Sequence, residues 1–219
     1  MIFSGMQLWN INSNYQQEST MHREMLAYEP TGQSSPDPAI AQLRKLYPGS
    51  IGWLTIPHTQ VNYPFAQGKD NQEFLHTDLH HNYSFAGTLF LDYRNSPDLS
   101  DFNSVIFGHH MRNGSMFGSV RSFNDAAFFK AHPTGTVYLA DVTYTIEFLA
   151  FAEIKSTDTV IYNTAIETDS DKADFLHHVR TVARNYRDIG ALTTDRFITL
   201  SSCDYDFANA RMVLIGRLA

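Results

Sequence analysis

The sequence predicts a mainly β fold with added helices. Short apolar runs recur from residue 51 onward and are separated by residues that favour turns, a spacing typical of a barrel or a sandwich. Two other stretches, one at the N-terminus and one at residues 171–188, carry apolar residues at helical spacing instead. With 219 residues, 43% of them hydrophobic, the chain is long enough to bury one substantial core.

The N-terminal part of the chain predicts two helices. Apolar residues between Leu8 and Tyr28 fall loosely on one helical face, and residues 29–37, with two prolines and a glycine, predict a connecting loop. Asp37 and Pro38 then supply an N-cap and a first-turn proline for a short helix that ends at Leu46. We expect residues 1–47 to form a helical extension that packs on the outside of a main domain formed by residues 48–219.

The remaining elements follow from the apolar runs. Strands are expected at 51–56, 61–65, 87–93, 104–107, 136–139 and 144–154, and again at 197–203 and 211–217. One long amphipathic helix, at 171–188, interrupts them, with Ser170 as its start cap and Gly190 as its end cap. Its apolar face consists of Phe175, Leu176, Val179, Val182, Ala183 and Tyr186.

A lone thiol at a strand end is the first candidate for chemistry. Cys203, the only cysteine, closes the run 197–203, and the Asp and Asn residues that follow it suit a turn. If the last two runs pair as an antiparallel hairpin, Arg211 becomes a neighbour of Cys203, so that a guanidinium could reach whatever the sulfur attacks. The pattern predicts a nucleophile beside an oxyanion stabiliser, and a buried inert thiol is the alternative interpretation.

Thiol catalysis also requires a proton donor, because an unperturbed cysteine has a pKa of about 8.5 and a leaving amine must be protonated. The best placed of the ten histidines are His109 and His110, which directly follow an apolar run. Successive strand residues point to opposite faces, so only one of the two can face Cys203. The alternation of strand residues is compatible with either histidine.

Two segments carry a resemblance to a known family. Residues 199–203, TLSSC, with Arg211 eight positions on, and residues 107–118, FGHHMRNGSMFG, together resemble class B sortases, which are cysteine transpeptidases of Gram-positive bacteria. The resemblance runs from about residue 8 to residue 219 and implies a closed β-barrel of about eight strands, with N-terminal helices and a long helix before the cysteine strand. It selects His109 as the catalytic histidine, with Cys203 and Arg211. Ser202 stands where class members usually have threonine, which keeps a hydroxyl there.

The resemblance also implies a reaction. Cys203 would attack a C-terminal sorting motif of a surface protein, Asn-Pro-x-Thr or LPxTG-like, while His109 protonates the leaving amine and Arg211 stabilises the oxyanion. The thioester would pass to an amine of a cell-wall precursor or to a pilin lysine. The implied substrate contacts are Asn71, Leu75, Ile161, Tyr162, Ser201 and Asp204. Structural alternatives exist, such as core packing for Leu75, a helix cap for Asn71 and a surface aromatic for Tyr162.

Several other functions fit less well. The net charge of −7 argues against a nucleic-acid partner. We expect no metal or cofactor, because the paired histidines are adjacent and diverge, and the acidic residues at 167–174 lack the spacing of an EF-hand. A catalytically inactive barrel, used as a surface-binding or pilus-associated module, is the main alternative. An L,D-transpeptidase-like enzyme is another, but that family places arginine two positions after the cysteine, where this chain has Tyr205.

Location is predicted from the family. Class B sortases carry an N-terminal membrane anchor, whereas the apolar start of this sequence is far shorter than the ~20 residues of a span and shows no signal-peptide features. We therefore expect a sequence trimmed of its anchor, from an enzyme at the extracytoplasmic face of a Gram-positive membrane.

Overall fold

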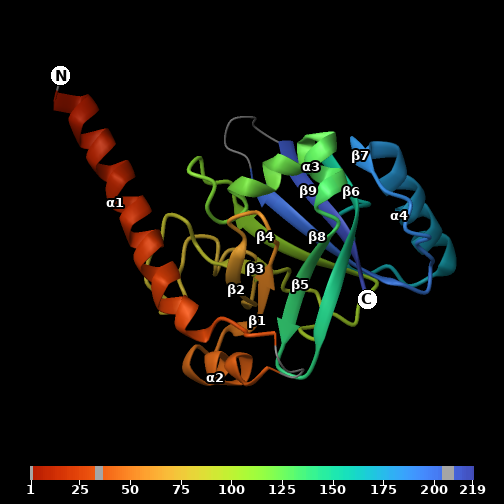
Figure 1. Ribbon diagram of the computed structural model, residues 1–219, viewed down its shortest axis with the longest axis horizontal. Coiled ribbons are helices and arrows are strands. Elements are labelled where there is room, and N and C mark those ends of the chain that lie inside the picture. Colours follow the sequence, from red (N-terminus) through yellow and green to blue (C-terminus); the bar gives the residue numbers. More distant parts are fainter. Residues whose placement is uncertain (1, 33–36, 204–209) are drawn as a thin grey trace.

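A computed structural model describes the chain except for residues 1, 33–36 and 204–209. Helices α1 (Ile2–Met25) and α2 (Pro38–Leu46) lie on one side of a β-barrel, and α4 (Asp169–Val182) lies on the other (Figure 1). The shorter helices are η1 (Leu26–Tyr28), η2 (Gly118–Asn124) and α3 (Ala126–Ala131). The strands are β1 (Ser50–Thr55), β2 (Asn62–Ala66), β3 (Leu89–Leu91), β4 (Asn103–His109), β5 (Thr134–Leu139), β6 (Thr143–Lys155), β7 (Asn185–Tyr186), β8 (Arg196–Cys203) and β9 (Ala210–Leu218).

Eight of the described strands close into a barrel. Their order is β5-β1-β2-β3-β4-β8-β9-β6, and β5 pairs with both β1 and β6, which joins the two ends of the sheet. Strand β7 pairs with β6 and lies outside the ring. The neighbours β2–β3 and β4–β8 are parallel, whereas the other pairs are antiparallel. The prediction of a closed, mainly β barrel of about eight strands with added helices is confirmed.

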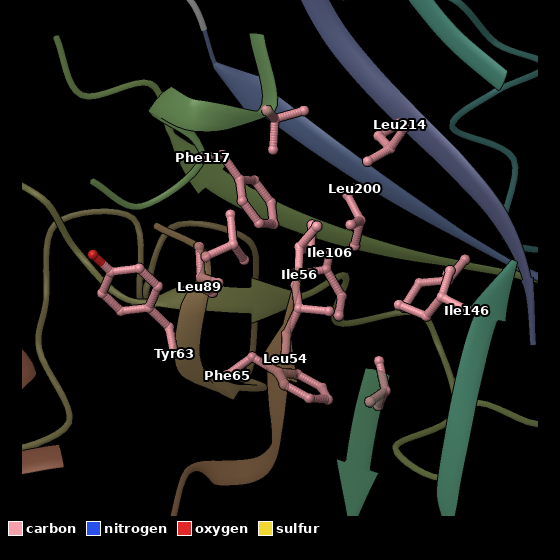
Figure 2. Packing of buried hydrophobic residues seen from close by; sticks show 14 of the residues in the cluster. Leu54, Ile56, Tyr63, Phe65, Leu89, Ile106, Phe117, Ile146, Leu200 and Leu214 are labelled. Atoms are coloured by element: carbon pink, nitrogen blue, oxygen red, sulfur yellow. The ribbon is translucent and has the colours of Figure 1, made fainter. Parts of the chain in front are cut away.

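Alternation along the strands separates the inside of the barrel from the outside. Ile106, Leu200 and Leu214 lie on one rung across β4, β8 and β9, and all three are buried in the barrel core (Figure 2). One residue further along, the rung of Phe107, Ser201 and Val213 faces outward. Val213 packs there in a second cluster, which lies between the barrel wall and α4.

A third cluster joins the N-terminal helices to the outside of the barrel. Met25, from α1, and Leu43, from α2, are buried with Trp53 and Phe74. The predicted start of α2 is confirmed, since the Asp37 carboxylate accepts a hydrogen bond of 3.0 Å from the Ala39 amide and Pro38 occupies the first turn. Among the helices of the described part of the chain, none has the length and apolar character needed to cross a membrane.

The prediction for the long helix was wrong at both ends. Helix α4 begins at Asp169 and ends at Val182, and Thr168, not Ser170, caps its start by accepting from the Asp171 amide. The chain leaves the helix early because residues 184–187 pair with β6: the Arg184 amide donates to the Phe151 carbonyl and the Arg187 amide to that of Leu149. Gly190 has a φ of +64° but lies in a later loop, not at the helix end.

Candidate active site

His109, Cys203 and Arg211 lie side by side on three neighbouring strands. His109, the last residue of β4, is in register with Cys203, the last residue of β8, through the parallel β4–β8 pairing. Cys203 is in turn directly opposite Arg211 on β9. The predicted hairpin between the last two runs is therefore confirmed, and the structure adds His109 to the same rung.

This rung lies on the outer face of the barrel wall. His109 follows Phe107 by two residues and so projects to the same outward face. Its side chain is nevertheless buried, with 4% of the residue exposed, because the loop at residues 74–88 covers it. His110, the alternative histidine, lies past the end of β4 and forms a bridge with Met116.

The ring of His109 is held by the backbone of Leu75. Nε2 lies 2.7 Å from the Leu75 carbonyl oxygen, which can only accept, so Nε2 carries a proton. In the neutral ring Nδ1 is therefore the basic nitrogen. Gly87 keeps the carbonyl in place: its φ is +59°, and a Cβ at that position would lie 2.3 Å from the Leu75 oxygen.

The protonation of His109 responds to several neighbours. Burial lowers the pKa of His109 below its ordinary value of 6.5 because the charged ring loses hydration. The hydrogen bond to Leu75 acts in the opposite direction, and the positive charges of His76 and Arg211 lower the pKa further. The neutral ring, which can take up a proton, is favoured near neutral pH.

A groove of about 540 Å³ opens beside Arg211. It brings together four residues that were predicted to bind substrate or to act in catalysis: Asn71, Leu75, Tyr162 and Arg211. Phe107 and Phe90 supply apolar surface, and the segment at 156–163 forms one wall. The Phe107 and Tyr162 rings stack with their centroids 6.0 Å apart.

Other predicted contacts are placed differently. Ser201 is fully buried, and its hydroxyl lies 2.9 Å from that of Tyr162, so it supports a groove residue from beneath. Ile161 is also fully buried, in the cluster under α4, and it takes part in the groove wall through its backbone: its carbonyl accepts from Asn103 and its amide donates to Asp158. Asp204 lies outside the described residues.

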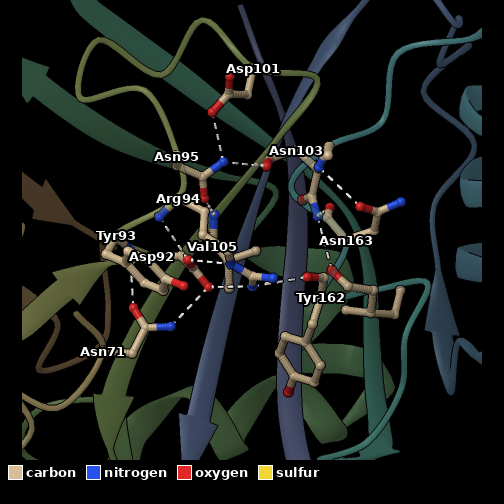
Figure 3. A network of polar contacts seen from close by, with 12 residues as sticks. Asn71, Asp92, Tyr93, Arg94, Asn95, Asp101, Asn103, Val105, Tyr162 and Asn163 are labelled. Atoms are coloured by element: carbon tan, nitrogen blue, oxygen red, sulfur yellow. Dashed lines mark hydrogen bonds and ion pairs between the residues drawn. The ribbon is translucent and has the colours of Figure 1, made fainter. Parts of the chain in front are cut away.

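Sequence reasoning missed an ion pair in the groove. Asp92 is fully buried and accepts from Arg94 at 2.7 and 2.9 Å and from the Asn71 amide at 3.0 Å (Figure 3). Burial would raise the pKa of Asp92, but these hydrogen bonds outweigh it and lower the pKa. Arg94 also donates to the Tyr162 carbonyl, so the pair connects Asn71 to the opposite wall. The sequence offered one sign of this ion pair: Asp92 directly follows an apolar run and stands two residues before Arg94.

A second missed residue is Asn103, at the start of β4. Its side-chain amide donates to the carbonyls of Ile161 and Asn163 at 2.9 and 3.1 Å, and its oxygen accepts from the Thr199 hydroxyl (Figure 3). One buried side chain thus joins β4 and β8 to the segment at 156–163. At the other end of this segment, Asp158 pairs with His178 on α4 at 2.8 Å.

Comparisons with known proteins agree with this fold. Residues 54–219 match the family described as Sortase domain. Sortase B of Listeria monocytogenes is 36% identical over 181 residues, which are 82% of this chain and 73% of that protein. The structure of sortase B from B. anthracis in complex with AAEK1 has a TM-score of 0.85 at 26% identity, covering 94% of this chain and 98% of that chain.

A second solved structure is sortase B from the Type II pilus of Streptococcus pneumoniae. Its TM-score is 0.71 at 36% identity, and the match covers 82% of this chain and 97% of that chain. Fold and matches together define a cysteine transpeptidase of the sortase type. The chain belongs to the sortase family, in class B. In general terms, the family implies a surface protein with a sorting motif as one substrate and an amine as the other.

Proposed function

We propose that this sortase forms a thioester between Cys203 and the threonine carbonyl of a sorting motif, and that His109 and Arg211 assist. The observation that carries the proposal is the shared rung of these three residues at the ends of β4, β8 and β9. Adjacent strands lie about 4.7 to 4.9 Å apart. His109 and Arg211 therefore flank Cys203 from the strands on either side of it, which lets the three side chains act on one peptide bond.

The first half of the reaction uses His109 as base and then as acid. Nδ1 of the neutral ring takes the thiol proton, and the thiolate attacks the carbonyl carbon to form a tetrahedral oxyanion. When the C–N bond breaks, the imidazolium returns this proton to the leaving amine. Because Nε2 is hydrogen-bonded to the Leu75 carbonyl oxygen, the His109 ring keeps one orientation through both steps.

The second half reverses the proton transfers. The incoming amine attacks the thioester and loses a proton to His109, and the thiolate of Cys203 leaves. In both halves the guanidinium of Arg211 donates hydrogen bonds to the oxyanion, for which it is suited because it lines the groove. Within the described part of the chain it donates from Nη1 to the Ala210 carbonyl, and a guanidinium carries five N–H donors in all.

The groove is our proposed site for the sorting motif, Asn-Pro-x-Thr or LPxTG-like. Asn71 and Tyr162 supply polar contacts and Leu75 an apolar one, while Ile161 and Ser201 hold the wall from below. The acceptor is an amine of a cell-wall precursor or a pilin lysine, and the pilus origin of the S. pneumoniae relative favours including the second. Such substrates place the enzyme at the outer face of a Gram-positive membrane.

Intact-protein mass spectrometry tests the proposal. The protein and its Cys203→Ala variant are incubated with peptides that carry either motif, with and without a glycine-terminated or lysine-containing amine. We expect an acyl adduct on the unaltered protein alone, released as an amide when the matching amine is added. No adduct with any peptide, together with a thiol that resists alkylation, would favour an inactive binding barrel.

A further inference from the structure

A second histidine lies against the ring of His109. The imidazoles of His76 and His109 stack with their centroids 5.1 Å apart and their planes at 26°. His76 is exposed, whereas His109 is buried. One ring thus faces solvent while it touches the ring that we propose as acid and base.

The backbone around His76 is well ordered by hydrogen bonds. Its carbonyl accepts from the Ser84 amide at 3.0 Å, and the next residue, Thr77, forms a bridge with Tyr83. The Tyr83 ring stacks on that of His76, with the planes at 27° and the centroids 6.3 Å apart. The stack on His109 therefore follows from the fold of the loop at residues 74–88.

We propose that His76 is a positioning residue that acts through His109 by controlling when the His109 ring carries a proton. This inference rests on the proposed role of His109 as acid and base. It needs no contact between His76 and the substrate, because the effect is transmitted between the two rings.

Charge repulsion is the physical basis. An unperturbed imidazole usually changes its charge between about pH 5 and pH 8. Two imidazolium rings at 5.1 Å repel each other, so a proton on His76 makes a proton on His109 less favourable. Among the described residues, the other charged or titratable neighbours of His109 are Arg211, on β9, and Cys203, paired with it on β8.

The same conclusion follows from the direction of the pKa of His109. Burial is the main cause of its decrease, and the charges of His76 and Arg211 add to it. A guanidinium stays charged in proteins, whereas an imidazole belongs to the class of side chains whose charge changes near neutral pH. His76 is therefore the neighbour through which pH can change the behaviour of His109.

The test compares a neutral and a permanently charged side chain at this position. His76→Gln and His76→Lys are made in the Cys203→Ala background, where no thiol titrates, and the His109 ring is followed by NMR against pH. In His76→Gln we expect the midpoint of His109 to rise by roughly half a pH unit to one unit, given two charges at this separation near the surface. In His76→Lys the midpoint should stay at or below that of the parent.

His177→Gln is the matched control, because His177 is exposed on α4, away from the groove. It should leave the midpoint unchanged. Midpoints in His76→Gln and His76→Lys that both equal the parent's, or that shift equally, would overturn the proposal. Thermal unfolding of each variant shows whether the fold is kept, and His76→Asn serves as a second neutral variant if His76→Gln is unstable.

A kinetic measurement links the effect to the reaction and separates the two proposals. With Cys203 restored, the pH profile of acylation in a single turnover should move toward higher pH in His76→Gln and not in His177→Gln. If His109→Gln acylates normally, the proposed function fails while the NMR result for His76 still stands. A different outcome is that His109→Gln is inactive while His76→Gln shifts neither the pH profile of acylation nor the NMR midpoint of His109. In that case only the proposed role of His76 fails.

Discussion

The backbone carbonyl of Leu75 accepts a hydrogen bond of 2.7 Å from Nε2 of His109, although the two residues belong to different parts of the fold. Leu75 lies in the loop that follows β2, and His109 ends β4. The bond fixes both the orientation of the imidazole and the nitrogen that carries its proton. Any change that moves this carbonyl should therefore alter the reaction without touching the thiol.

Gly87→Ala should test this link. A Cβ at position 87 would overlap the Leu75 and Phe74 carbonyl oxygens at 2.3 and 2.6 Å, and the left-handed φ adds about 1–2 kcal/mol of strain. We expect acylation to slow by about 10- to 100-fold, as small displacements of a reacting group do. Gly190→Ala is the control, since it has a similar φ of +64° but nothing within 4 Å. Equal rates in the two variants would contradict the prediction.

Arg211→Lys should lose activity although the charge is kept. Lysine presents a single ammonium, whereas arginine presents a planar set of donors, and loss of one oxyanion donor costs about 100- to 1,000-fold in turnover. Acylation rates measured by mass spectrometry check this. The control is Arg217→Lys on the same strand, where the guanidinium pairs with Glu147 and Asp195 far from the rung. Near-normal turnover of Arg211→Lys would remove Arg211 from the mechanism.

Asn103→Ala should weaken substrate binding more than it slows chemistry. The variant leaves the Ile161 and Asn163 carbonyls and the Thr199 hydroxyl without their partner, at a cost of about 2 to 5 kcal/mol in the free energy of unfolding. We expect KM for the motif peptide to rise because the wall at 156–163 loosens.

Asn185→Ala is the matched control for Asn103→Ala. Asn185 also donates to two carbonyls, those of Phe123 and Asn124 at 2.8 and 3.0 Å, but it lies away from the groove. It should lower stability and leave KM unchanged. Parallel changes in KM for both asparagine variants would indicate a general loosening of the fold.

The free energy of unfolding should fall as the pH drops below about 6.5, partly because of His109. The pKa of His109 is lowered in the folded state, so the stability it contributes is complete above the unfolded pKa. As the pH falls through the interval down to the folded pKa, the unfolded chain binds the proton first and stability is lost. Urea unfolding at about pH 7.5 and about pH 5.5 should show a smaller loss for His109→Asn than for the parent. An equal loss would show that other groups cause it.

Local signals in the sequence predicted local structure well. Asp37 and Pro38 start α2 as expected because a cap and a first-turn proline act within one turn. The end of α4 was missed because Asn185 and Tyr186 pair with β6, a partner that is remote in the sequence. Helical periodicity continues through these residues, so the sequence alone favoured a longer helix.

The candidate site also contains residues that could be predicted from the sequence and residues that could not. The Cys203–Arg211 pair could be predicted from two apolar runs separated by a few residues that favour turns, and the resemblance to class B sortases selected His109. The Asp92–Arg94 pair and Asn103 could not be found, because their importance depends on burial and on partners from other segments. A polar residue in a strand looks the same in the sequence whether it faces water or a buried carbonyl.

By itself, the sequence determined the mainly β character, the strand positions, the cap of α2 and the hairpin that sets Arg211 opposite Cys203. These features depend on residues that are near each other in the chain. Only the tertiary structure showed how the barrel closes, through the β5–β6 pairing, and placed β4 parallel to β8. Pairing of distant strands depends on which apolar faces are buried together, and that is settled by the whole core. The same packing set the Leu75 carbonyl and the His76 ring against His109.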